Sequence, residues 1–263
     1  MKSDTISASA TRALGLLGAR LMLVGLAAVL VWMLARGFDP GAEFPPSPML
    51  LSLSLLPVNL LSLWLVIRLL RVDGQTLRGL FAPRRGVGLV ADIGWALLWI
   101  AVLYIPFVAT IIGTMWLLYG ANMFTAFETV FVNPDAASVT TPVWALVLGL
   151  VAVITFAPLN APAEEAVYRG YALSRLSGAW PRALAVTACS VAFGLQHAFF
   201  APTVDAMIVY VVAFTVWGIG SSLIAQKQKR LMPIAISHFV VNLMTSSPAV
   251  IFPALQLAGI IPS

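Results

Sequence analysis

The chain carries at residues 143–170 the sequence VWALVLGLVAVITFAPLNAPAEEAVYRG. The first half of this stretch is almost entirely apolar, whereas Glu164, Glu165 and Arg169 lie near its end. An ionisable residue at membrane depth is costly and therefore usually marks a functional site. Two adjacent carboxylates behind an apolar run thus predict a polar site inside a bundle of membrane helices.

The composition agrees with a membrane protein. Of 263 residues, 60% are hydrophobic and 10% are charged, against roughly 25% charged in an average soluble protein. The polar stretches are too short for an independent soluble core. We therefore predict an all-α fold, a polytopic transmembrane helix bundle, in which residues 1–263 form a single integral-membrane domain with a motif-bearing core at about 143–247.

Seven apolar segments predict membrane spans, since a span needs roughly 20 apolar residues. The third segment is longer than one crossing requires, and tilt or an interfacial start near Asp92 would absorb the excess. We expect a polar loop at 120–142, and the short tail at 250–261 leaves an eighth helix open. The predicted spans are 14–35, 49–70, part of 87–119, 143–176, 183–200, 204–225 and 231–245.

Charge asymmetry predicts the orientation of the bundle. With the N-terminus cytoplasmic, the outer loops hold only Arg36 among basic residues, which follows the positive-inside rule. Arg20, within the first span, is expected to extend its guanidinium toward the inner surface. The inner basic residues are Lys2, Arg12, Arg68, Arg71, Arg78, Arg84, Arg85, Arg175, Arg182, Lys227, Lys229 and Arg230; the outer acidic residues are Asp39, Glu43, Glu128, Asp135 and Asp205.

Helical spacing indicates how the carboxylates would act. Glu165 and Arg169 are four residues apart, with glutamate on the N-terminal side, which is the favoured order for an ion pair. Glu164 would be rotated about 100° away and left free to accept a proton as a general base.

The chain's two histidines, His197 and His238, lie inside later apolar spans. His238 shares a helix face with Asn242, so the two could bind a metal or donate hydrogen bonds to a developing oxyanion. Phe193 and His197 share a face in the same way. At about 1.5 Å per residue, both histidines and Glu164 fall in the middle-to-inner half of the bilayer, so they could converge.

Each feature also has a simpler interpretation. Paired glutamates at a helix end are usually solvated, a lone histidine in a span often packs with a satisfied hydrogen bond, and an asparagine more often joins helices. Their combination in three separate spans at similar depth favours a functional site.

Three motifs stand in order along these spans: Glu164-Glu165-x-x-x-Arg169, Phe193-x-x-x-His197 and His238-x-x-x-Asn242. This order resembles the CAAX protease and bacteriocin-processing family of intramembrane proteases, which includes type II CAAX prenyl endopeptidases and bacterial abortive-infection membrane proteins. The resemblance implies an eight-helix bundle with a cavity that opens toward the cytoplasm.

The resemblance also implies residue roles. Glu164 would activate the attacking water, with His197 sharing the proton transfer. His238 and Asn242 would stabilise the tetrahedral oxyanion. The candidate catalytic residues are thus Glu164, Glu165, His197, His238 and Asn242, with Arg169 and Phe193 in support.

Metal involvement is open at this point. Glu165, His197 and His238 are candidate ligands for a divalent metal such as Zn²⁺, which binds histidine and carboxylate together with water. A metal-free, glutamate-activated water fits the same residues. Cys189 is the only cysteine, so a cysteine-based metal site and an intrachain disulfide are both excluded.

We therefore predict a CAAX-type intramembrane endopeptidase, glutamate- or metal-dependent, that hydrolyses a peptide bond near the cytoplasmic face. Its partners would be a peptide or membrane-protein substrate and the lipid bilayer, with no nucleic acid, and arginine- and alanine-rich usage suggests a bacterial inner membrane. One alternative is a non-proteolytic scaffold or immunity protein of the same fold. Another is a proton- or metal-coupled transporter, which the lack of a visible repeat disfavours.

Overall fold

The computed structural model describes residues 2–82, 88–132 and 141–261. These residues are predominantly helical and contain no strand. Seven helical segments among them are long and apolar enough to cross a membrane, which confirms the predicted all-α polytopic bundle. The orientation of the N-terminus stays a prediction. Three of the charged residues used to predict the orientation lie outside the described residues, namely Arg84, Arg85 and Asp135. The side chain of Lys2 is not described either.

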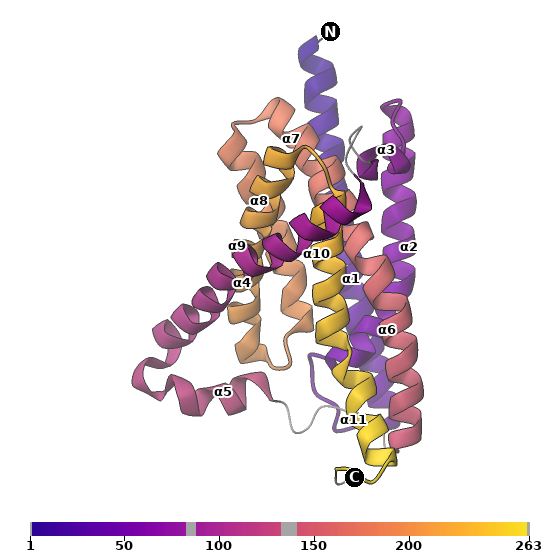
Figure 1. Ribbon diagram of the computed structural model, residues 1–263, viewed down its shortest axis with the longest axis vertical. Helices are drawn as coiled ribbons and strands as arrows, with labels where there is room; N and C mark the ends of the chain where they lie inside the picture. The colour runs from indigo at the N-terminus through magenta and orange to yellow at the C-terminus, as the bar shows by residue number, and fades with distance from the viewer. Residues whose placement is uncertain (1, 83–87, 133–140, 262–263) are drawn as a thin grey trace.

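Most of the helices lie side by side along the long axis of the molecule, with the two termini at opposite ends (Figure 1). A π-helical segment, Ala166–Ala172, joins α6 to α7 without a break. Within the described residues the helices are α1 (Lys2–Phe38), α2 (Pro48–Val72), α3 (Leu77–Phe81), α4 (Leu89–Tyr119), α5 (Met123–Phe131), α6 (Pro142–Glu165), α7 (Leu173–Ala179), α8 (Arg182–His197), α9 (Val204–Gln228), α10 (Met232–Ser246) and α11 (Pro248–Leu257).

Helix α4 runs obliquely across the other helices (Figure 1). The third predicted span is therefore tilted, as its excess length indicated. Asp92, in the first turn of α4, is buried and pairs with Arg230, which follows α9. This ion pair fixes the start of the tilted helix against the end of its neighbour.

The predicted polar loop at 120–142 is wrong for its first half, which forms a 3-10 turn and then α5. Met123 and Val130 of α5 are buried and belong to one apolar cluster with Val209 of α9. Because these apolar residues share one face of the segment, it folds as an amphipathic helix against the bundle.

The C-terminal tail forms no separate crossing. Helix α11 follows α10 directly, and the two make one candidate span, Met232–Leu257. This span packs along α6, where a Cβ added at Gly149 would overlap the carbonyl group of Ala249. The described part of the chain therefore has seven candidate spans, and the eighth membrane-spanning helix that the resemblance implied is not among them.

Helices α8 and α9 approach closely because small residues lie between them. A Cβ added at Gly218 would lie 3.0 Å from the Cα atom of Ser190, and one at Gly194 would lie 2.5 Å from the carbonyl oxygen of Val211. This contact sets the position of α8, whose last residue is His197.

Replacing Gly194 by alanine should therefore separate α8 from α9. Overpacking of this kind costs about 1–3 kcal/mol, so we expect the thermal midpoint in detergent to fall by several degrees. The matched control is Gly15→Ala in α1, where an added Cβ meets nothing within 4 Å. A Gly194→Ala protein as stable as the Gly15→Ala protein would contradict the close approach.

Candidate active site

The two glutamates lie at the junction between α6 and the π-helical segment. Both are fully buried, and all seven residues of the π-helical segment are buried as well. Pro158 and Pro162 lie inside α6, and each removes a backbone N–H donor from the helix. The π-helical turn follows directly after Pro162 and the two glutamates. Such turns inside helices are frequently found at functional sites.

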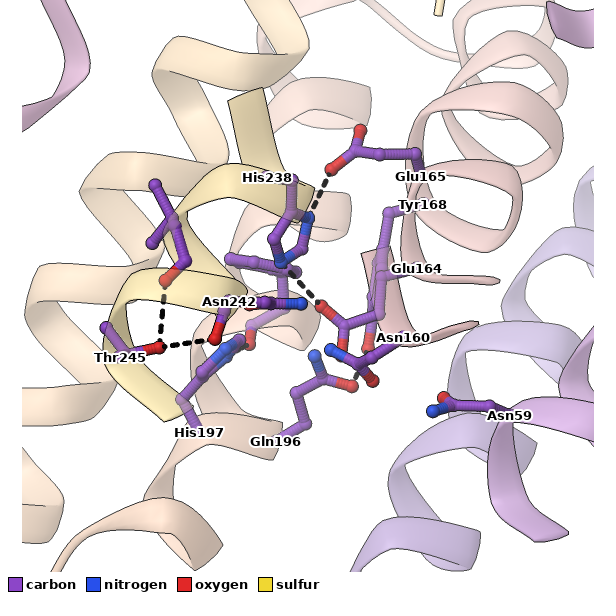
Figure 2. A network of polar contacts seen from close by, with 12 residues as sticks. Asn59, Asn160, Glu164, Glu165, Tyr168, Gln196, His197, His238, Asn242 and Thr245 are labelled. Carbon is purple, nitrogen blue, oxygen red and sulfur yellow. Dashed lines mark hydrogen bonds and ion pairs between the residues drawn. The ribbon is translucent and has the colours of Figure 1, made fainter. Parts of the chain in front are cut away.

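Glu165 is held by two partners. Its Oε1 atom accepts a hydrogen bond from Nη1 of Arg169 at 3.1 Å and another from Nδ1 of His238 at 2.9 Å. The Glu165–Arg169 ion pair is thus formed as the spacing predicted. Because a carboxylate accepts the bond, Nδ1 of His238 carries the proton, and Nε2 is turned toward Oε2 of Glu164 at 3.5 Å (Figure 2).

Arg20 does not reach the membrane surface, and that prediction is wrong. Its side chain is buried, and it forms an ion pair with Oε1 of Glu164 at 2.9 Å. Glu164 is therefore not free, as the sequence suggested, but is anchored through one of its two oxygens. The guanidinium stays inside because acceptors from α2, α6 and α8 surround it, which offsets the cost of burying a charge.

All five N–H donors of the Arg20 guanidinium have acceptors. The bonds run to Gln196 Oε1 at 3.3 Å, Asn59 Oδ1 at 2.9 Å, Ser62 Oγ at 3.0 Å, Asn160 Oδ1 at 3.0 Å and Glu164 Oε1 at 2.9 Å. The hydroxyl group of Tyr168 also donates to Gln196, at 2.9 Å. An ionisable residue at membrane depth usually marks a functional site, and this reasoning applies to Arg20 as it does to Glu164. The sequence therefore already indicated that Arg20 could belong to the polar site.

His197 lies on the other side of the site. Its Nδ1 atom donates to the carbonyl oxygen of Phe193 at 2.7 Å, which leaves Nε2 as the atom available for proton exchange. The imidazole stacks on Phe214 with 3.7 Å between ring centroids and 9° between planes. Phe193 also packs under the guanidinium of Arg169, at 4.3 Å from the ring centroid.

Asn242 follows His238 by one helical turn on α10, and both are buried. Its Nδ2 atom has no hydrogen-bond partner among the described residues. Figure 2 shows Asn242, His197, His238 and Glu164 gathered around one space. The structure thus brings together the residues of all three motifs.

His197, His238 and Asn242 face one end of a cavity of about 410 Å³, and Glu164 lies behind them rather than in its lining. Asn160, His197, His238 and Asn242 line it, and most of the remaining lining is apolar or aromatic. The cavity extends to the start of α2 and the junction of α10 with α11, at the end of the bundle away from the N-terminus (Figure 1). The predicted cytoplasmic N-terminus would place this end in the outer half, whereas the resemblance implied an opening toward the cytoplasm, so these two predictions do not both hold for this cavity.

The three candidate metal ligands do not form a metal centre in this arrangement. Among the described residues, no group of three or more His, Cys, Asp or Glu side chains is placed to hold a metal ion. The Oε1 atom of Glu165 is already bonded to Arg169 and to His238. His197 likewise commits its Nδ1 atom to a backbone carbonyl.

Fold and geometry together define a polytopic helical membrane protein with a carboxylate, histidine and amide cluster at the end of an apolar cavity. Residues 141–244 match the family model described as type II CAAX prenyl endopeptidase Rce1-like, so the chain contains an Rce1-like domain. This confirms the resemblance and supports an intramembrane protease role. A search of curated proteins and a search of solved structures each found no match.

Replacing Arg20 by methionine should leave the Glu164 carboxylate buried without its counter-ion. Breaking a buried pair from one side costs about 3–5 kcal/mol, so we expect a large fall in the thermal midpoint of the purified protein. Arg36→Met, at an exposed position of the same helix, serves as the control. The double variant Arg20→Met, Glu164→Gln should be more stable than the sum of the single effects, and strict additivity would refute the coupling.

Proposed function

We propose that this protein is an intramembrane endopeptidase in which Glu164 activates water for attack on a peptide bond. The observation that carries the proposal is the asymmetry of the Glu164 carboxylate. Its Oε1 atom is anchored by Arg20, whereas Oε2 accepts no hydrogen bond among the described residues and faces Nε2 of His238 at 3.5 Å. An anchored carboxylate with one uncommitted oxygen is suited to bind and deprotonate a water molecule.

In the proposed reaction, Oε2 of Glu164 takes a proton from water while the water oxygen bonds to the carbonyl carbon of the substrate. The resulting oxyanion accepts hydrogen bonds from Nδ2 of Asn242 and from Nε2 of His238, which donates when the imidazole carries a proton on both nitrogens, because Nδ1 is bonded to Glu165. When the C–N bond breaks, the leaving amine takes the proton from Glu164, directly or through Nε2 of His197. The products are a carboxylic acid and an amine, so one water is consumed per bond.

The other residues hold this arrangement in place. Arg20 compensates the negative charge of Glu164 inside the bundle, where an unpaired charge is costly. Glu165 fixes the orientation of His238 by accepting from its Nδ1 atom, and Arg169 in turn fixes Glu165. We propose no separate chemical step for Glu165, Arg169 or Phe193.

The proposed substrate is a peptide or a segment of a membrane protein. The aromatic lining of the cavity favours apolar side chains. We also propose that the scissile bond lies near the cytoplasmic face. The two glutamates are the last residues of α6, and the chain beyond them leads to the end of the bundle where the basic residues lie. Location in a bacterial inner membrane is likewise part of the proposal.

A non-proteolytic scaffold or immunity protein is the second candidate. The observation that favours it is that Glu164 and Glu165 both belong to ion pairs with buried arginines. Such a network would hold helices together without performing chemistry. The two candidates differ in whether the purified protein cleaves peptides.

Replacing Glu164 by glutamine tests the water-activating role. Glutamine still accepts a hydrogen bond from Arg20 but no longer balances its charge, so the thermal midpoint should fall and cleavage is measured well below it. Loss of a general base typically costs about 10²–10⁴-fold in rate. The assay is cleavage of a quenched peptide library by purified protein in detergent, with Glu128→Gln at an exposed position of α5 as the control. Equal cleavage by wild type and Glu164→Gln would refute the role.

The same assay distinguishes the remaining alternatives. Loss of wild-type cleavage upon addition of a strong chelator would indicate a metal-dependent reaction, and full retention would favour the glutamate-only mechanism. No cleavage by any of the proteins would favour the scaffold, and the next measurement would be a search for a binding partner.

Replacing Asn242 by leucine should remove a donor to the oxyanion while keeping the size of the side chain. Loss of one such donor typically costs about 10²–10³-fold in kcat, and KM should change little because the donor acts in the transition state. Thr245→Val is the control, since Thr245 lines the same cavity but bonds only backbone carbonyls of its own helix. A fall in kcat of similar size in both variants would argue against the assignment.

A further inference from the structure

A second cavity, of about 340 Å³, lies at the opposite end of the bundle from the first. Its charged lining residues are Arg169, Lys229 and Arg230, and none of the described carboxylates lines it. Ser174, Ser177 and Gln226 add polar groups, and the rest of the lining is glycine, alanine and leucine. The cavity is therefore cationic and rich in hydrogen-bond donors.

Two arginines of this cavity keep donors that find no acceptor among the described residues. Arg169 uses Nη1 for Glu165, but its Nε and Nη2 atoms have no partner, although the side chain is only 1% exposed. Arg230 pairs through Nη2 with Asp92, and its Nε atom is also without a partner. A buried donor without an acceptor is destabilising, and an anion in the cavity would supply the missing acceptor.

Further donors face the same space. Lys229 forms no ion pair with any described residue. The hydroxyl oxygens of Ser174 and Ser177 accept bonds from Arg175 and Gln226, so each hydroxyl proton can be donated elsewhere. Lysine and serine donors beside arginine are the groups that commonly bind phosphate.

The cavity also lies at the level where lipid headgroups are expected. It is placed where α9 ends at Gln228 and α10 begins at Met232, and both helices belong to candidate membrane spans. A basic pocket between spans at the membrane boundary is a typical binding place for anionic lipid headgroups. At about 340 Å³ it has room for far more than one water, which occupies about 30 Å³.

We infer that this cavity, lined by Arg169, Lys229, Arg230, Ser174 and Ser177, binds a phosphate group. The source is the headgroup of an anionic phospholipid or a free phosphate ion, and both offer the oxygens that the unpartnered donors require. Arg169 belongs to both sites, because its Nη1 atom holds Glu165 and Glu165 holds His238. A phosphate in the cavity would therefore contact Arg169, which holds the Glu165 carboxylate that orients the His238 side chain.

Lipid binding provides the first arm of the test. Full-length protein is placed in nanodiscs of phosphatidylcholine with or without phosphatidylglycerol, and lipid retained after extraction is measured by native mass spectrometry. The variant is Lys229→Gln and the matched control is Lys227→Gln, an exposed lysine two residues away that does not line the cavity. One lysine near a lipid headgroup contributes about 1 kcal/mol, so we expect roughly five-fold weaker phosphatidylglycerol retention in Lys229→Gln alone.

The second arm replaces lipid with sodium phosphate at constant ionic strength and follows the thermal midpoint in neutral detergent. A rise with phosphate that is lost in Lys229→Gln and kept in Lys227→Gln assigns the site to the free ion. Equal losses in the two lysine variants would overturn the site, as would the absence of any preference for phosphatidylglycerol together with no effect of phosphate. These readouts do not depend on proteolysis, so they stand or fall separately from the proposed function.

Discussion

The polar interior of this protein depends on one buried cation, the guanidinium of Arg20. A charge of this kind is strongly disfavoured in an apolar bundle unless its donors are satisfied and its charge is balanced. Arg20 meets both conditions, because it bonds acceptors on α2, α6 and α8 and pairs with Glu164. These acceptors would themselves be costly inside the bundle without the donors of Arg20, so each supports the burial of the other.

Arg20 also explains how two adjacent carboxylates acquire different surroundings. Successive helical residues point about 100° apart, so Glu164 faces α1 and Glu165 faces α10. Glu165 is bonded by Arg169 and His238, whereas Glu164 keeps one oxygen without a hydrogen bond. The pair therefore combines a fixed carboxylate that orients an imidazole with a second carboxylate that retains an available oxygen.

The sequence was sufficient for features that depend on local composition. Apolar runs located the spans, and the Glu165–Arg169 pair followed from helical spacing alone. Arg20 was misjudged because its partners lie on other helices, and packing determines whether a guanidinium has acceptors within reach. The extent of the first cavity could not be predicted for the same reason, since its walls come from many segments. Helix α5 was missed because its nine residues are too few for a membrane span, and its apolar face becomes evident only where it packs against α4 and α9.

The matched domain at 141–244 does not contain the counter-ion of its own first glutamate. Arg20 and Glu164 are separated by 144 positions, so α1 is synthesised long before its partner on α6 exists. An arginine at the centre of an inserting helix costs about 2.5–3.5 kcal/mol, and the first span must tolerate that cost until α2, α6 and α8 arrive. The polar cluster around Glu164 can therefore form only after α6 and α8 are made, and residues 141–244 by themselves lack the arginine that balances its charge.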